Sequence, residues 1–226
     1  MEYIKHIQNK LTKLRLQPIR VFCLHHVCKK FDAESINACD WMQIDEFKSK
    51  VLALRQCGVE FISLADAYQH ICQDRIRSKK YAVLSFDDGY ASLKEILPWL
   101  EKRQIPVTLF INGKYLDGKS YRKNPKEKYL TKEELFSLSS PFIEVANHGW
   151  EHIRVTEMTD EEFNASVKQN VGLLSKHPNY IPFWAYTYGS YTAQTENYLN
   201  QQCIIPVYID GQKNYNEKRV IHRELL

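Results

Sequence analysis

Short apolar runs typical of strands alternate with helical patterns along most of this chain. The strand-like runs cover residues 19–27, 59–64, 81–86, 106–111, 142–146, 181–186 and 204–209. The helical patterns lie at residues 42–58, 64–76, 90–103, 131–138, 159–177 and 192–202. Strands separated by helices pair in parallel, because a parallel connection needs a long crossover. The alternation predicts an α/β fold with parallel strands, as an open sheet or a closed (β/α) barrel.

The composition is that of an ordinary globular protein. The chain has 226 residues, of which 44% are hydrophobic and 26% are charged, without an internal repeat or a flexible linker. We therefore expect residues 1–226 to form a single domain. The net charge of +4 comes without a long basic run, which argues against nucleic-acid binding.

The first residues and the cysteines bear on cellular location. Residues 1–20 lack the apolar core and the cleavage site of a signal peptide, and no stretch resembles a membrane span. The six cysteines contain no CxxC pair, so we expect reduced thiols and a cytoplasmic protein. Residues 1–16 form a basic amphipathic helical pattern, which either packs on the domain or makes a weak peripheral membrane contact.

Two adjacent carboxylates follow the apolar run at residues 81–86. Asp87 and Asp88 precede Gly89, and a polar turn closed by glycine is one interpretation of this sequence. The other is a functional site, since a buried carboxylate must be neutralised, paired or bound to a metal. In parallel folds, functional side chains gather at the carboxyl ends of strands, which is where this pair lies.

Other strand-like runs end in polar side chains as well. His25 lies near the end of the first run, and His148 and His152 follow the run at residues 142–146. Histidines four residues apart lie on the same side of a helical turn, although such pairs also occur on exposed helices. Two imidazoles and one carboxylate are a common ligand set for a divalent metal ion. The strand ends therefore suggest a metal site at one edge of the fold.

The segment CLHHVC also contains metal-ligating residue types, namely Cys23, His25, His26 and Cys28. Its flanks are typical of a strand, in which alternate side chains point to opposite faces. Because the four side chains cannot all converge from an extended segment, we do not expect a structural zinc site within it.

The order and spacing of these motifs resemble a known family. SFDDGY, then VANHGWEH 60 residues later, then FWAYTYGSY, are similar to the polysaccharide deacetylases, the NodB-homology enzymes of carbohydrate esterase family 4. CLHHV and the segment leading to YAVLSFDDGY are closest to the poly-N-acetylglucosamine deacetylase branch. The resemblance extends over residues 19–210. It implies a distorted (β/α) barrel with a groove across its strand ends.

The resemblance also implies roles for the residues that match the motifs. Asp88, His148 and His152 would bind one divalent metal ion, and Asp87 would be the general base. Zinc is the expected ion, while nickel, cobalt and iron suit the same ligands. A metal ion polarises the acetyl carbonyl and acidifies water, and the second carboxylate takes up the proton.

A proton donor for the departing amine is expected as well. In the branch named above the donor is a histidine near the start of the domain, which corresponds to His25. The other branch places it near the carboxyl terminus, where His222 is a poorer match, so we favour His25. The backbone amide near Tyr188 is expected to stabilise the oxyanion. Trp150, Tyr186 and Tyr188 are the candidate substrate-binding residues.

Three positions depart from the family pattern. Gly149 replaces the serine or threonine that supports the metal-binding loop. Ala185 stands where many members have an arginine that pairs with the catalytic base, and Thr187 replaces the usual proline. None of these changes removes an expected metal ligand.

The sequence thus predicts a metal-dependent hydrolase that removes an N-acetyl group from an amino sugar. The substrate would be a polysaccharide, or its cytoplasmic precursor, of the capsule or O-antigen type. The same chemistry on an O-acetyl ester or a non-sugar amide is an alternative. A second alternative is a carbohydrate-binding relative with weak catalytic activity. The presence of both carboxylates and both histidines argues against the second alternative, because a binding protein needs no base beside a metal.

Overall fold

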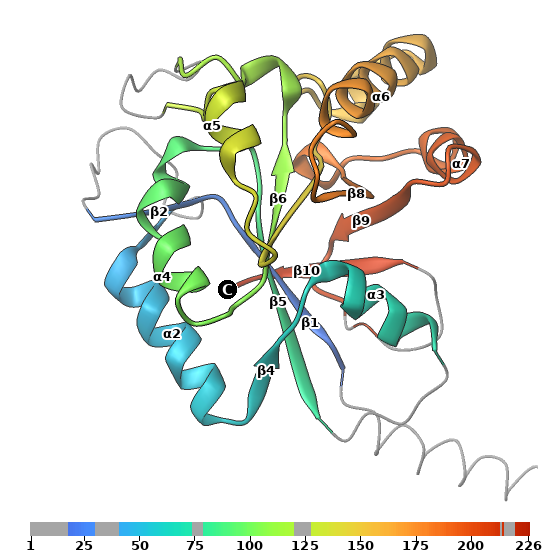
Figure 1. Cartoon of the computed structure of the whole chain (residues 1–226). Coiled ribbons are helices and arrows are strands. Elements are labelled where there is room, and N and C mark those ends of the chain that lie inside the picture. Colours follow the sequence, from blue (N-terminus) through green and yellow to red (C-terminus); the bar gives the residue numbers. More distant parts are fainter. Residues whose placement is uncertain (1–17, 30–40, 74–78, 120–127, 213, 215–219) are drawn as a thin grey trace, which may run out of the picture.

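The computed structural model of the chain describes residues 18–29, 41–73, 79–119, 128–212, 214 and 220–226. These residues form a parallel sheet that closes on itself, with helices around it (Figure 1). The predicted (β/α) barrel is therefore confirmed. The helix expected over residues 1–16 lies outside the described residues. Among the described helices, none is long and apolar enough to span a bilayer.

Seven strands make the closed ring, and every pairing within it is parallel. In ring order they are β1 (Arg20–Leu24), β10 (Ile221–Leu225), β9 (Ile205–Ile209), β8 (Tyr180–Ala185), β7 (Ile143–Asn147), β6 (Val107–Ile111) and β5 (Lys80–Phe86). The pairing of β1 with β5 closes the ring. An eighth strand, β4 (Val59–Phe61), pairs with the first half of β5. A separate two-stranded sheet joins β2 (His26–Cys28) to β3 (Trp41–Gln43).

Helices cover the outside of the ring between the strands (Figure 1). They are α2 (Ile44–Gln56), α3 (Leu64–Cys72), α4 (Leu97–Glu101), α5 (Lys132–Ser137), α6 (Asp160–Leu174) and α7 (Ala193–Gln201). Three of them begin at a threonine whose hydroxyl accepts the N3 amide, as the sequence predicts for Thr131. The helix expected over residues 90–103 is divided into a 3₁₀ turn, Ala91–Glu95, and α4. Pro98 lies in the first turn of α4, where it costs no hydrogen bond.

Alternation along the strands separates two apolar layers. On β5, Ala82, Leu84 and Phe86 pack in one cluster with residues of α2, α4 and α5. Val83 packs in another with Val21 of β1 and with residues of α3 and β7–β10. Strands with both faces buried read as continuous apolar runs, which explains why the sequence pattern located most of them.

The register of the ring brings the strand ends to one edge. Phe86 of β5 lies opposite Leu24 of β1 and Leu109 of β6. Farther around, Asn147 of β7 lies opposite both Ile111 of β6 and Trp184 of β8. The residues that follow these strands therefore start from the same end of the ring, which is the end where the sequence predicts a site.

A buried asparagine ties α6 to this end of the ring. Asn170 is fully buried and donates to the carbonyl of Ile111 and to Oδ1 of Asn147, both at 3.1 Å. Its own Oδ1 accepts the amide of Gly113 at 2.8 Å. A Cβ at Gly113 would lie 2.6 Å from that oxygen, so the close approach requires glycine. The network fixes the ends of β6 and β7, from which the loops of the candidate site begin.

Candidate active site

The two carboxylates after β5 lie in a tight turn beneath the other loops. Asp88 has a positive φ of 72° and Gly89 a φ of 84°, and the turn points both carboxylates into the ring end. Asp87 is 3% exposed and Asp88 is 1% exposed, so neither is the solvated end of a strand. The polar-turn interpretation explains the glycine but not the buried charges.

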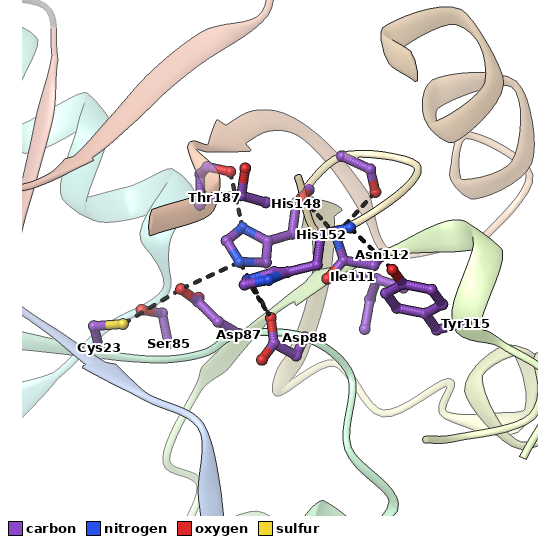
Figure 2. Close-up of polar contacts among 12 residues, drawn as sticks. Cys23, Ser85, Asp87, Asp88, Ile111, Asn112, Tyr115, His148, His152 and Thr187 are labelled. Atoms are coloured by element: carbon purple, nitrogen blue, oxygen red, sulfur yellow. Dashed lines mark hydrogen bonds and ion pairs between the residues drawn. The ribbon is translucent and has the colours of Figure 1, made fainter. Parts of the chain in front are cut away.

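Asp88 faces both expected histidines (Figure 2). Its Oδ1 lies 3.3 Å from Nε2 of His148 and 3.2 Å from Nε2 of His152. Ligand atoms about 2.0–2.2 Å from a tetrahedral zinc ion are roughly 3.3–3.6 Å apart, so these separations fit one shared ion. The three side chains form one of two groups that could hold a metal ion among the described residues. The structure thus brings together the three ligands that the sequence predicts.

The segment from His148 to His152 is a loop, so the helical turn considered from the spacing is wrong. Gly149 has a φ of 90°, which does not fit a helix and which other residues rarely adopt. The Asn112 side chain holds the loop by donating to the carbonyls of His148 and Gly149. The loop conformation, rather than a helical period, makes the two imidazoles converge.

A hydrogen bond orients the first imidazole. Nδ1 of His148 lies 2.9 Å from the carbonyl oxygen of Ala185, at the end of β8. A carbonyl can only accept, so Nδ1 carries a proton and Nε2 faces Asp88 as the available ligand atom. The amide of His152 donates to the hydroxyl of Tyr115 at 3.4 Å. Both histidines therefore come from a loop fixed to neighbouring elements.

Asp87 is held by a buried arginine from the last strand. Arg223 of β10 is 1% exposed, and its Nη1 and Nη2 donate to Oδ1 of Asp87 at 2.5 Å and to Oδ2 at 2.8 Å. Nη1 also donates to the hydroxyl of Ser85, which in turn donates to the carbonyl of Phe22. Position 185, at the end of β8, holds an alanine and not an arginine that could pair with Asp87. In the structure, Arg223 makes this contact from a different strand.

The surrounding charges keep both carboxylates ionised. Burial opposes ionisation of Asp87, but Arg223, His148 and His25 outweigh it and lower its pKa to about 2. Burial opposes ionisation of Asp88 too, yet His152, His148 and His25 hold its pKa well below the ordinary value. Both adjacent carboxylates thus remain charged: they share His148 and His25, while Arg223 acts on Asp87 and His152 on Asp88.

The structure distinguishes the two candidate proton donors. His25 follows β1, and one of its ring nitrogens lies within 4.8 Å of a ligand atom of Asp87 and of Cys23. His222 precedes Arg223 on β10, so its side chain points to the opposite face of the strand. There its Nδ1 lies 2.9 Å from Oδ2 of Asp210. Only His25 is therefore close to the carboxylate pair.

The three candidate substrate-binding aromatics lie in different places. Tyr188 is 54% exposed, has a positive φ of 55°, and its ring centroid lies 4.4 Å from that of His152. Tyr186 is 1% exposed and packs in a cluster with residues of α6 and α7, so its ring does not face solvent. Trp150 is half-buried against Gly113 and lines a separate cavity of about 290 Å³ beside α6. Of the three, only Tyr188 is exposed beside the metal-ligand group.

Two other departures from the family pattern also have local explanations. The hydroxyl of Thr187 donates to the carbonyl of Ile153, a contact that proline could not make. The hydroxyl of Ser166, on α6, accepts the amide of Trp150 at 2.9 Å, next to Gly149. These bonds attach the loop of the two histidines to η5 (Thr187–Gly189) and to α6.

Arg223 is the site residue that sequence reasoning missed. The sequence pattern marks residues 219–225 as a poor match for the proton donor and does not predict a strand there. In the structure, buried Ile221 and Arg223 alternate with less buried His222 and Glu224, as in a strand, but the sequence shows no matching apolar alternation. The strand places an arginine on an inward position, where a buried carboxylate partner is required.

The Arg223–Asp87 pair predicts a large stability loss in Arg223→Gln. An unpaired buried carboxylate would remain, so the free energy of unfolding should fall by about 3–5 kcal/mol. The deficit should shrink as the pH is lowered, because burial then raises the Asp87 pKa and the folded state takes up a proton. Urea unfolding between pH 5 and pH 8 measures both effects.

Arg20→Gln is the matched control, since Arg20 forms an exposed pair with Glu224, with Nε 2.7 Å from Oε1. Its loss should cost at most about 1 kcal/mol. The double variant Asp87→Asn with Arg223→Gln should recover part of the stability. Equal losses of stability in Arg223→Gln and Arg20→Gln would contradict the buried pairing of Arg223 with Asp87. A loss of stability in Arg223→Gln that does not change with pH would contradict it as well.

Comparison with known proteins identifies the family and the fold of this chain. The Bacillus subtilis (strain 168) protein YxkH, provisionally named a polysaccharide deacetylase, is 25% identical over 118 residues. The match spans 52% of this chain but only 39% of that protein. The fold is similar to that of IcaB from Ammonifex degensii, with a TM-score of 0.77 and 21% identity over 94% of each chain.

The Streptococcus pyogenes deacetylase PplD, solved in complex with acetate, has a TM-score of 0.75 and 18% identity, covering 92% of each chain. The BpsB deacetylase domain from Bordetella bronchiseptica has a TM-score of 0.67 and 18% identity, covering 92% of this chain and 95% of that one. Residues 74–204, more than half of the chain, match the family model described as polysaccharide deacetylase. On this match, the chain belongs to the polysaccharide deacetylase family.

Proposed function

We propose that this protein is a metal-dependent hydrolase that removes an N-acetyl group from an amino sugar. One observation carries the proposal: a carboxylate that faces two imidazoles lies next to a second carboxylate held by an arginine. The first group has the composition and spacing of a metal site. The second is a charged base that the arginine keeps in a fixed orientation. Family membership favours the acetylated sugar as the substrate class.

Asp88, His148 and His152 would hold the ion. Two nitrogens and one oxygen suit zinc, and they accept nickel, cobalt or iron as well. A bound divalent ion would polarise the acetyl carbonyl and make water more acidic. The hydrogen bond from His148 Nδ1 to the Ala185 carbonyl keeps the ligating nitrogen in place.

Asp87 would accept the proton of the attacking water. Both of its oxygens are bonded to Arg223, so its orientation is fixed by a planar, two-point contact. Its Oδ2 lies 3.8 Å from Nε2 of His148, which places the base directly beside the proposed ligands. The arginine thereby gives the adjacent carboxylates different roles, with Asp88 toward the metal and Asp87 toward the proton.

His25 would donate a proton to the departing amine. It lies at the end of β1, on the same side of the strand as Cys23, and faces Asp87. Its Nδ1 is buried and has no hydrogen-bond partner within the described residues. The pairing of His222 with Asp210 on the other face leaves His25 as the donor that can reach the substrate.

Tyr188 would border the substrate. Its exposed ring lies under the guanidinium of Arg154, with Cζ 4.3 Å from the ring centroid, and beside His152. A tyrosine held in the left-handed region is uncommon, and such backbone conformations are frequent at functional sites. We assign its backbone amide to the developing oxyanion and its ring to the sugar.

The identity of the acetylated sugar and the cellular location of the protein stay predictions. A capsule or O-antigen precursor, the cytoplasmic location and the membrane contact of residues 1–16 all come from sequence reasoning. An O-acetyl ester or another amide would use the same groups, whereas a binding protein would need neither Asp87 nor Arg223 in this arrangement. Assays on acetylated glucosamine oligomers and on aryl acetates separate the two hydrolase alternatives.

We predict that purified protein binds one equivalent of zinc when the free metal concentration is kept low. Asp88→Ala and His148→Ala should each lose that equivalent, because each removes a ligand. Asp87→Asn should keep the metal and lose activity by about 10²–10⁴-fold, the usual contribution of a general base. Metal analysis after dialysis, combined with an acetate-release assay, tests all three variants.

Metal that persists in both ligand variants would refute the metal site. Metal binding without acetate release from any acetylated sugar, ester or amide would favour the carbohydrate-binding relative instead.

A second prediction compares the two histidines directly. His25→Gln should lower kcat by about 10²–10⁴-fold, since an amide cannot protonate the amine. His222→Gln is the matched control and should change kcat little, because His222 points to the opposite side of β10. An ester substrate should be less sensitive to His25→Gln than an amide, since an alkoxide or phenoxide leaves more readily without a proton. A larger loss of kcat in His222→Gln than in His25→Gln would assign the proton donor to His222.

A further inference from the structure

Cys23, His25 and Asp87 form a second group of ligand atoms beside the proposed metal ligands. Sulfur, nitrogen and oxygen atoms from the three side chains all lie within 4.8 Å of one another. From this geometry we propose that the group is a second, thiophilic metal site, which takes a divalent ion such as zinc, cobalt or cadmium when the metal is in excess.

Strand geometry explains why these residues converge. Cys23 and His25 are two positions apart at the end of β1, so both side chains leave the same face. Sγ of Cys23 lies 3.4 Å from Oδ2 of Asp87. With metal–sulfur distances of about 2.3 Å and metal–oxygen distances of about 2.0–2.2 Å, two ligands of a tetrahedral ion lie roughly 3.5 Å apart. That separation therefore already matches one edge of a tetrahedral site.

The sulfur and nitrogen ligand atoms have few competing contacts, whereas both oxygens of Asp87 are bonded to Arg223. Nδ1 of His25 has no hydrogen-bond partner among the described residues. The thiol of Cys23 makes only a weak sulfur hydrogen bond to Asp87. A cavity of about 40 Å³ beside Cys23 and His25 has room for a water.

Charge determines the order in which the two sites would fill. In the first group Asp88 faces two imidazoles, whereas in the second group Asp87 is already paired with the positive charge of Arg223. A second dication would also lie close to the first. The Cys23 site should thus be the weaker one, and its thiolate should favour softer ions.

Binding at this site is an exchange of a proton for a metal ion. Cys23 is a buried thiol, so its S–H bond breaks, the S–metal bond forms and the proton passes to solvent. No oxidation or reduction is involved. The bound ion would occupy Asp87 and His25, the proposed base and acid, so excess metal should inhibit the enzyme. This last consequence rests on the proposed function, whereas the binding itself does not.

Cobalt titration of metal-free protein tests the site by spectroscopy. The first equivalent, at Asp88, His148 and His152, should give visible cobalt bands without thiolate-to-metal charge transfer. The second equivalent should add a charge-transfer band in the near ultraviolet. Asp88→Ala should lose the first equivalent and keep the band, whereas Cys23→Ser should keep the first equivalent and lose the band. Cys203→Ser, which removes an exposed thiol, is the matched control and should behave as wild type.

The proposal fails if wild-type protein shows no charge-transfer band at several equivalents, or if the band survives in Cys23→Ser. The wild-type and Asp88→Ala titrations decide the matter even if Cys23→Ser does not fold. A charge-transfer band in a protein without deacetylase activity would support the site and reject the proposed function. Deacetylase activity in a protein without the charge-transfer band would support the proposed function and reject the second metal site.

Discussion

The buried contact between Asp87 and Arg223 is the interaction on which the rest of the site depends. Two consecutive carboxylates with almost no solvent exposure would repel each other if both relied on the same partner. Arg223 binds both oxygens of Asp87, while Asp88 faces His148 and His152. The arginine thus gives the two carboxylates different partners, with Asp88 toward the two imidazoles and Asp87 kept ionised beside them.

Closure of the ring makes that contact possible. β10 lies between β9 and β1, and the pairing of β1 with β5 brings the last strand within reach of the turn after β5. Arg223 and Asp87 are 136 residues apart in the chain, so only the closed barrel joins them. The loop of the two histidines is attached in turn to β6, β8 and α6, through Asn112, Ala185 and Ser166. The site is therefore built from several strand ends whose positions the barrel fixes.

Sequence reasoning found the parts of the site that strand patterns mark. Asp87, Asp88 and the two histidines each follow a long apolar run, so their common edge could be predicted. Local conformation was harder to predict from the sequence. The histidine spacing suggested a helical turn, but the segment is a loop in which Gly149 has a positive φ. Arg223 was missed because its strand is a short stretch of mixed polarity, whose burial depends on the partner across the ring. Tyr186 and Tyr188 could not be separated, since their exposure depends on the turn between them.

A crystal structure of the protein with one equivalent of zinc tests the central claim most directly. The account predicts a single ion bound by Asp88, His148 and His152, with Asp87 outside its coordination shell and still paired with Arg223. Zinc bound by Asp87, with Arg223 displaced from it, would contradict the division between the two carboxylates. A first ion at Cys23 and His25 instead would contradict the order in which we expect the two metal sites to fill.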